Sequence, residues 1–350
     1  MNAMIAFLLA QDGLTNGAIY ALVAIAIVMV FSVTRIIFVP QGEWIAYSAL
    51  CLASLRNHTV PPLVWLLALG GALVSLRDFW HFARDRTQIG ALKSGFLYLF
   101  VPAIIAGMVA LGSKANLPYD AQILLTLALI VPLGPIVYRL AYQPIENASV
   151  LVLLITSIAV HVVLLGSGLL MFGTEGIRLP AQVDGSWSLS DFTISGQSLF
   201  VMGFTIAVIL LMFSFFGRTL HGKALRATAY NRVGARLMGI STSSAGTLTF
   251  ALAALLGAIA GVLAGPLSTL YYDTGFTISL KGFVAAIFGG LVSYPLAAVG
   301  ALALGGMESF SSFYASAFKD SIVFAAVIPI LLLRSLLSPH ESHDEEAVEE

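Results

Sequence analysis

The clearest deficit in this sequence is electric charge. Asp, Glu, Lys and Arg make up 10% of the 350 residues, whereas a soluble domain carries roughly 25%. Apolar residues make up 59% of the chain, so its few charged side chains cannot cover a water-facing globule of this size. The composition therefore excludes a soluble enzyme and a disordered protein. The net charge of −1 provides no field that attracts nucleic acid, and we expect no nucleic-acid partner.

Cysteine is almost absent as well. Cys51 is the single cysteine of the sequence, which excludes an intramolecular disulfide and any metal site built from several thiolates. No His-Glu-x-x-His pattern occurs, and we expect this chain to bind no metal or cofactor and not to be an enzyme. No lysine or arginine precedes the first apolar segment, so we expect that segment to be retained rather than cleaved as a signal peptide.

Long apolar runs occupy most of the sequence. A spanning helix needs about 20 mostly apolar residues, and these runs lack the period-two alternation of barrel strands. The predicted fold class is an all-α polytopic membrane protein. An apolar piece at 281–293 is too short to cross a bilayer about 30 Å thick, and it is predicted to be a broken or half-helix. About ten spanning helices are predicted, near residues 7–33, 43–56, 61–76, 95–112, 121–138, 148–172, 197–216, 246–270, 295–313 and 320–337.

The remaining charges lie mainly between the spans and at the C-terminal end. With the N-terminus outside the cell, twelve of the 17 Lys and Arg residues fall on the cytoplasmic side, as the positive-inside rule requires. We therefore predict one transmembrane domain over residues 1–338, with the N-terminus outside and the C-terminus in the cytoplasm. Residues 173–196 are predicted to be an external loop and residues 217–245 a cytoplasmic loop. Residues 339–350 are predicted to be an acidic, disordered tail.

A few ionisable side chains fall within or at the edge of the predicted spans. The segment Gln41-Gly42-Glu43 either lines a translocation path at a helix break or places Glu43 in water at the membrane interface. His161 lies in the middle of a span, where a neutral imidazole is either buried with one partner or in contact with a substrate. Glu308 lies near the outer end of its span among serines, which indicates a wet cavity or the membrane rim.

Three glycines form a regular series. Gly257, Gly261 and Gly265 are four residues apart, so they lie on one face of a predicted helix. Small residues at this spacing let two helix backbones approach closely. They predict helix packing, either within the chain or against a partner subunit.

The loop at 217–245 is the most informative polar segment. Residues 217–224 nearly match the phosphate-binding pattern G-x-x-x-x-G-K-[ST], but Ala224 replaces the hydroxyl that holds Mg²⁺ and a membrane helix precedes the loop. We therefore exclude nucleotide binding there. Residues 223–240 are basic and helix-forming, and Gly239 is a helix stop. Such a short helix can dock into a partner's cleft, although an ordinary basic cytoplasmic loop has the same composition.

The order of residues in this loop also resembles a known motif. The coupling segment of LivH-type permeases, from branched-chain amino acid ABC importers, is similar to Leu225-Arg226-Ala227, Asn231 and Ala235-Arg236-Leu237-Met238-Gly239-Ile240. Val233 and Gly234 depart from the Glu and Ala that are usual in that family. The resemblance covers nearly the whole chain except residues 57–120, an extra helical pair, and the acidic tail. Further similar segments are Phe250-Ala251-Leu252-Ala253, Lys281-Gly282-Phe283, Gly289-Gly290-Leu291 and Lys319-Asp320-Ser321-Ile322.

The resemblance implies the ABC importer permease fold, in a multi-pass protein of the bacterial inner membrane. The chain is then half of a translocation path for branched-chain or related small amino acids. The implied partners are a second permease subunit, two cytoplasmic ATPases that bind ATP and Mg²⁺, an external solute-binding protein and the lipid bilayer. The alternative is a self-sufficient secondary transporter or channel for a small organic solute. The residues expected to couple to the ATPases are Arg226, Asn231, Arg232, Ala235, Arg236 and Gly239. Those expected on the translocation path are Gln41, Gly42, Glu43, Thr156, Gly289 and Gly290.

Overall fold

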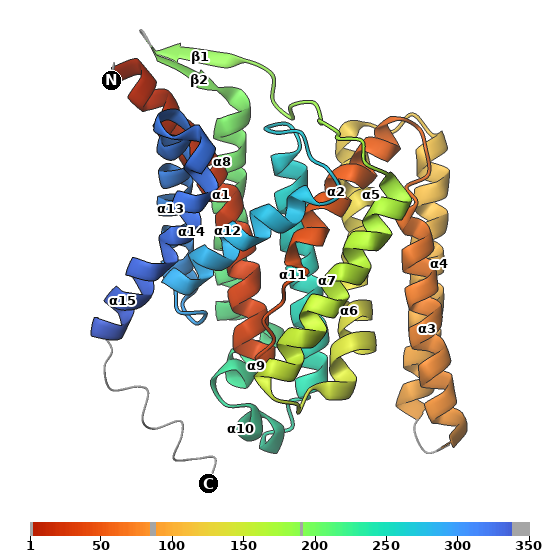
Figure 1. Cartoon of the computed structure of the whole chain (residues 1–350). Helices are drawn as coiled ribbons and strands as arrows, with labels where there is room; N and C mark the ends of the chain where they lie inside the picture. Colours follow the sequence, from red (N-terminus) through yellow and green to blue (C-terminus); the bar gives the residue numbers. More distant parts are fainter. Residues whose placement is uncertain (1–2, 85–88, 190–191, 338–350) are drawn as a thin grey trace.

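The structure is a computed structural model of the chain, and it describes residues 3–84, 89–189 and 192–337. Most of these residues belong to helices that pack into one bundle (Figure 1). The predicted acidic tail, residues 339–350, lies outside the described residues. The α-helices are α1 (Ala3–Thr34), α2 (Gln41–Arg56), α3 (Leu63–Arg84), α4 (Ile89–Lys114), α5 (Tyr119–Ile130), α6 (Leu133–Val137), α7 (Val150–Phe172), α8 (Gly196–Arg218), α9 (Leu220–Tyr230), α10 (Arg232–Leu237), α11 (Thr242–Ala264), α12 (Thr274–Phe288), α13 (Tyr294–Tyr314), α14 (Lys319–Ala325) and α15 (Val327–Leu337). The other elements are the π-helix η1 (Tyr138–Tyr142), the 3-10 helices η2 (Gln143–Ile145) and η3 (Ser316–Phe318), and the strands β1 (Ser186–Leu189) and β2 (Phe192–Ser195).

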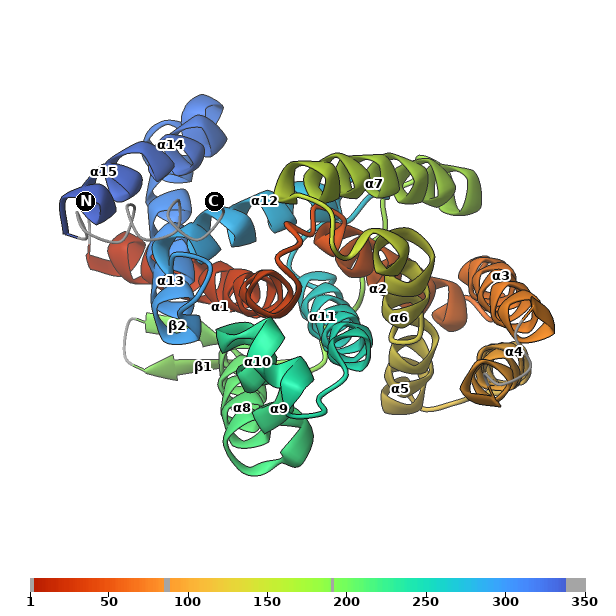
Figure 2. The ribbon, with the colours of Figure 1, turned by 90° about the horizontal axis from the view of Figure 1, so that it is seen from below.

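Helix α1 runs through the centre of the bundle. Its 32 residues span about 48 Å at 1.5 Å per residue, which is enough to cross a bilayer. Most of its apolar side chains are buried because α8, α11, α12 and α13 pack around it (Figure 2). Gly13 and Gly17 lie directly against the backbone of α13, so these two helices cross closely.

The lengths of the helices bear out the predicted all-α polytopic fold. Within the described residues, eight helical segments are long and apolar enough to span a membrane. Two of the ten predicted spans are not of that length. The first, at 43–56, corresponds to α2, which has 16 residues and reaches about 24 Å. The second, at 320–337, is divided into α14 and α15, since Pro329 lacks the N–H that a continuous helix requires.

Helix α12 corresponds to the predicted half-helix at 281–293. It has 15 residues, begins seven residues earlier than predicted and ends at Phe288. Gly290 has a φ of +63° and Leu291 a φ of +60°, and this left-handed turn sends the chain directly into α13. Because α12 and α13 also pack against each other, the half-helix ends inside the bundle (Figure 1).

Helices α3 and α4 form a hairpin at one edge of the bundle (Figure 2). The Ser75 hydroxyl donates a hydrogen bond of 2.8 Å to the carbonyl of Gly95, which joins the two helices inside their contact. Large side chains such as Trp65 and Leu111 are exposed on the outer faces. An exposed apolar surface of this kind suits contact with lipid or with another membrane helix.

The two ends of the bundle carry different structures. At the end where α1 begins, β1 and β2 form an antiparallel hairpin in which Ser186 lies opposite Ser195 (Figure 1). At the opposite end, α9 and α10 follow α8 and lie below the bundle in the same view. The segments predicted as the external loop, 173–196, and the cytoplasmic loop, 217–245, therefore lie at opposite ends of the molecule.

Candidate functional site

The segment Gln41-Gly42-Glu43 forms the first turn of α2, deep in the bundle. The Gln41 side chain is buried, and its amide donates a hydrogen bond of 2.9 Å to the carbonyl of Ala253 in α11. Gly42 lies so close to Gly275 of α12 that a Cβ on either residue would strike the other's carbonyl. The segment therefore joins three helices within this chain, at the end of a short helix that begins inside the bundle.

Glu43 forms a buried pair with His161. The carboxylate oxygen Oε1 lies 2.8 Å from Nδ1 of the imidazole. Glu43 is 1% exposed and His161 8% exposed, and the imidazole stacks on the Phe276 ring with 4.4 Å between centroids. This placement removes the interpretation that Glu43 is solvated at the interface. The sequence gives no sign that the two residues meet, because they are 118 positions apart.

The other residues proposed for the path do not gather around Glu43. The Thr156 hydroxyl donates to the carbonyl of Val152 in its own helix, α7. Ser157, the next residue, faces inward instead and its hydroxyl lies 3.0 Å from that of Tyr142. Gly289 and Gly290 form the turn after α12, where the nearest neighbours of Gly289 belong to that turn and to α13. The six predicted path residues thus occupy three separate places.

A second buried charge cluster links α1, α12, α13 and α14. The Lys281 ammonium lies 2.5 Å from a carboxylate oxygen of Glu308 and 3.0 Å from one of Asp320. The Tyr20 hydroxyl donates to the other oxygen of Glu308 at 2.5 Å. Lys281 and Glu308 are almost fully buried. The sequence does not predict this pair, although each residue stands out as an ionisable group within an apolar segment.

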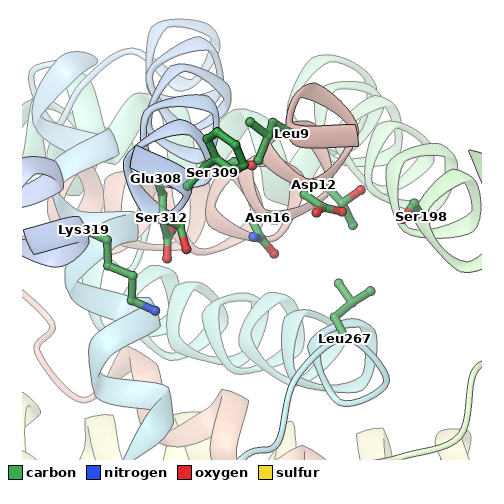
Figure 3. A pocket seen from close by; sticks show the side chains of 11 residues that line it. Leu9, Asp12, Asn16, Ser198, Leu267, Glu308, Ser309, Ser312 and Lys319 are labelled. Atoms are coloured by element: carbon green, nitrogen blue, oxygen red, sulfur yellow. The ribbon is translucent and has the colours of Figure 1, made fainter. Parts of the chain in front are cut away.

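This cluster borders two adjoining cavities near the end of the molecule that carries the β-hairpin. Their volumes are about 500 and 430 Å³. Both cavities are lined by Asn16, Leu267, Glu308 and Lys319, so we treat them together as the polar chamber. Figure 3 shows side chains of α1, α13 and α14 that face this space, with Asp12 and Lys319 among them. The chamber has the size of a small-molecule site and an unusually polar lining for a membrane-spanning bundle.

Helices α9 and α10, the α9–α10 segment, form a well-capped pair at the opposite end. The Thr219 hydroxyl accepts a hydrogen bond of 2.9 Å from the N–H of Gly222 at the start of α9. The Asn231 side chain does the same for Gly234 at 2.8 Å, at the start of α10. Gly239 has a φ of +81° after α10, a conformation that favours glycine. These caps hold a short, exposed segment in one defined shape.

One surface of the α9–α10 segment is apolar and exposed. Tyr230 is 94% exposed and Leu237 is 83% exposed, with Val233 and Met238 also largely in the open. Leu225 and Ala235 point the other way and are buried. Arg226 is exposed, and within the described residues it makes no ion pair. Apolar side chains on a projecting polar segment are typical of a protein-docking surface.

The two remaining predicted coupling residues bind within the chain. Arg236 lies 3.2 Å from a carboxylate oxygen of Glu146, and Arg232 lies 4.0 Å from the other. The Tyr138 hydroxyl of η1 also donates to Glu146 at 3.3 Å. Glu146 therefore attaches the α9–α10 segment to the connection between α6 and α7. Nothing in the sequence marks Glu146 as a partner of this segment, since it lies 90 residues from Arg236.

The glycine series of α11 packs within the chain. A Cβ on Gly257 would lie 2.8 Å from the Trp44 side chain, and one on Gly261 would strike the Ile45 carbonyl of α2. Gly265 faces Leu179 in the loop after α7. Of the two alternatives that the sequence left open, contact within the chain accounts for all three glycines.

These features together define a class of protein. The described part of the chain forms a bundle with eight potential membrane spans, a half-helix beside a polar chamber and a capped helical pair at one end, which is the organisation of a membrane transport permease. The comparison with protein families agrees. The chain belongs to the branched-chain amino acid transport system permease component family, whose model matches residues 89–333.

Individual relatives extend the match to almost the whole chain. The LivH permease of the high-affinity branched-chain amino acid transport system of Escherichia coli K12 is 28% identical over 331 residues, which is 92% of this chain and 91% of that protein. The BraD permease of Pseudomonas aeruginosa is 27% identical and covers 92% of each chain. LivH of Salmonella typhimurium is 34% identical over 204 residues, which is 56% of this chain and 66% of that protein.

No solved structure gives a match to this chain. The sequence matches confirm the resemblance to LivH-type permeases, and they support a permease subunit rather than a self-sufficient secondary transporter or channel.

Proposed function

We propose that this permease is one half of the membrane pathway of an ABC importer for branched-chain or related small apolar amino acids. It acts with a second permease subunit, two ATPases in the cytoplasm and a solute-binding protein outside the inner membrane. The matched relatives are named as high-affinity branched-chain amino acid transport permeases, which supports this substrate class. ATP and Mg²⁺ belong to the ATPases, and we assign no cofactor or metal to this chain.

The orientation of the proposed complex follows from the positions of the cations. The end of the bundle that carries α9 and α10 faces the cytoplasm, and the β-hairpin and the N-terminus face outward. Lys223, Arg226, Arg232 and Arg236 all belong to the α9–α10 segment, which favours the cytoplasmic side for it. The polar chamber then opens on the side from which a binding protein delivers its solute.

The observation that carries the proposal is the exposed apolar surface of the α9–α10 segment. A surface of this kind outside the spans requires a cover, and a cleft of an ATPase is a suitable one. ATP closes the ATPase pair, and the capped segment transmits this movement as a rigid body. Because Glu146 holds the segment to the connection between α6 and α7, the movement reaches the spans. The path between the two permeases then alternates between outward-open and inward-open states.

Co-purification tests this docking. The full chain is co-expressed with candidate ATPases, and the ATPase recovered on the tagged permease is measured. A charge placed in an apolar contact removes a central interface anchor, so Tyr230→Asp with Leu237→Asp is expected to lower the recovery about tenfold or more. Arg236 is a less suitable target, since its substitution also breaks the bond to Glu146.

The matched control is Trp187→Asp, which places the same charge on an exposed aromatic residue of the β-hairpin at the other end of the molecule. This variant is expected to retain the ATPases. Equal ATPase recovery with wild type and the double variant would show that the α9–α10 segment is not the docking surface.

A further inference from the structure

The polar chamber combines both signs of charge with apolar walls. Its charged lining consists of the acids Asp12, Asp273, Glu308 and Asp320 and the cations Lys281 and Lys319. Such a lining is unsuitable for a purely apolar solute, and it is equally unsuitable for an ion of one sign. Leu9, Leu267 and Phe313 supply apolar surface in the same space.

Some charged side chains that line the chamber have no ion-pair partner in the described part of the chain. Lys281 lies between Glu308 and Asp320, so those three groups form a closed cluster. Asp12, Asp273 and Lys319 also line the chamber, and none of them makes an ion pair within the described part of the chain. Two carboxylates and one ammonium therefore remain available to a molecule that enters.

Two hydroxyls of largely buried serines are also available. Ser198 is 5% exposed and Ser309 is 6% exposed, yet both line the chamber (Figure 3). Neither side chain makes a hydrogen bond within the residues that the structure describes. Neither hydroxyl oxygen is closed off from the cavity, so both open onto the chamber and are available to water or a polar solute.

We propose that the polar chamber is a reception site for a zwitterionic amino acid. Its carboxylate is attracted by Lys319, which lines both cavities, and its ammonium group by the carboxylates of Asp12 in one cavity and Asp273 in the other. The serine hydroxyls complete the hydrogen bonds, and Leu9, Leu267 and Phe313 contact a small apolar side chain. The charges of the ligand complement those left unpaired on the wall, and the volume accommodates a molecule of that size. The choice of an amino acid rests on the proposed function, whereas the location of the site rests on the lining residues.

Ligand binding to the permease alone tests this site, since neither ATPases nor a binding protein is needed. The full chain is placed in phosphatidylcholine nanodiscs, and saturation-transfer NMR is recorded with L-leucine, 4-methylpentanoate and 3-methylbutylamine. The two analogues each lack one charge of leucine. We expect leucine to bind about tenfold more tightly than either analogue, because each loses one charge-assisted contact.

The substitutions assign the two charges separately. Lys319→Gln is expected to reduce leucine binding to the level of 3-methylbutylamine, and Asp12→Asn with Asp273→Asn to the level of 4-methylpentanoate. The matched controls are Lys114→Gln and Glu175→Gln, which change exposed residues that do not line the chamber, and they are expected to leave binding unchanged. Ser309→Leu fills the chamber without a change of charge and is expected to abolish binding.

Three outcomes would overturn the site. These are no leucine signal above empty nanodiscs, equal signals for leucine and its analogues, or full binding in the Lys319 and Ser309 variants. Each is distinguishable from a failure of the proposed function. Loss of ATPase docking leaves the NMR result untouched, and a negative NMR result leaves ATPase co-purification untouched.

Discussion

Glu43 and His161 form one of the buried polar contacts that attach α7 to the bundle. Helix α7 is otherwise largely exposed, and the Tyr47 hydroxyl, which donates to the Leu164 carbonyl at 2.5 Å, is a second attachment. A buried carboxylate that loses its single partner keeps the full cost of its burial, about 3–5 kcal/mol for a broken buried pair. The pair therefore acts as one unit, and either residue without the other is expected to be worse than neither.

This unit is measurable as a double-mutant cycle. His161→Ala and Glu43→Ala are each expected to lower the free energy of unfolding by about 3 kcal/mol, and the double variant by less than the sum. Unfolding is followed by reaction of the fully buried Cys51 with a thiol-reactive fluorophore. Ser167→Ala, on the exposed side of α7, is the control and is expected to be neutral. Strict additivity of the two changes would contradict the pairing.

The sequence indicated that Glu43 and His161 were unusual residues for a membrane segment, but not that they meet. The same holds for Lys281 and Glu308, which lie 27 positions apart on two helices joined by a left-handed turn. An ionisable residue in an apolar run stands out in a sequence because burying its charge costs free energy. Which residue it pairs with depends on how the helices are arranged in space. That arrangement is determined by all the packing contacts of the fold together.

At the scale of single elements, the contact between α2 and α11 depends on the absence of side chains. Gly261 lies against the Ile45 carbonyl and the Ser48 side chain, so even one methyl group requires the helices to separate. Helix propensity acts in the opposite direction, since alanine is favoured over glycine by about 1 kcal/mol within a helix. Packing should win at this position, because overpacking typically costs 1–3 kcal/mol or more.

The same glycine-to-alanine substitution is expected to change the stability in opposite directions at two positions. The added Cβ of Gly261→Ala would strike the Ile45 carbonyl, so the upper part of the overpacking range applies, about 2–3 kcal/mol. After the propensity gain of about 1 kcal/mol, a net destabilisation of about 1–2 kcal/mol is expected. Gly203→Ala, in α8, is the control, since no atom lies within 4 Å of its added Cβ and a small stabilisation is expected. The stabilities of the Gly261→Ala and Gly203→Ala variants are measured by the reaction of the Cys51 thiol with the fluorophore during thermal unfolding. A stabilising Gly261→Ala would refute close packing of α2 on α11.

The glycine spacing correctly predicted close helix packing. It did not identify which helix packs there, because a stripe of small residues can accommodate many different helix surfaces. The sequence also predicted the short helix near 281–293 from its length alone. It did not predict the division of 320–337, where Pro329 interrupts a run that is apolar throughout. Hydropathy reports which residues avoid water, whereas the continuity of a helix depends on backbone hydrogen bonds.

At the scale of the whole molecule, the proposed mechanism depends on which end faces the cytoplasm. The N-terminus and the β-hairpin share one end of the bundle, and the α9–α10 segment occupies the other (Figure 1). One measurement on each end therefore determines the orientation. The polar chamber and the proposed docking surface also lie toward opposite ends, so the proposed sites of solute reception and ATPase docking are separated by the bundle.

Cysteine labelling in intact spheroplasts measures this orientation. The wild-type chain is a nearly silent background, because its single cysteine, Cys51, is fully buried. Trp187→Cys is expected to react with a membrane-impermeant maleimide added outside, since residue 187 is exposed on the hairpin. Tyr230→Cys should react only after the membrane is permeabilised. The reverse pattern would place the α9–α10 segment outside and contradict both the ATPase docking and the reception site, because ATP is available only in the cytoplasm and a binding protein only outside.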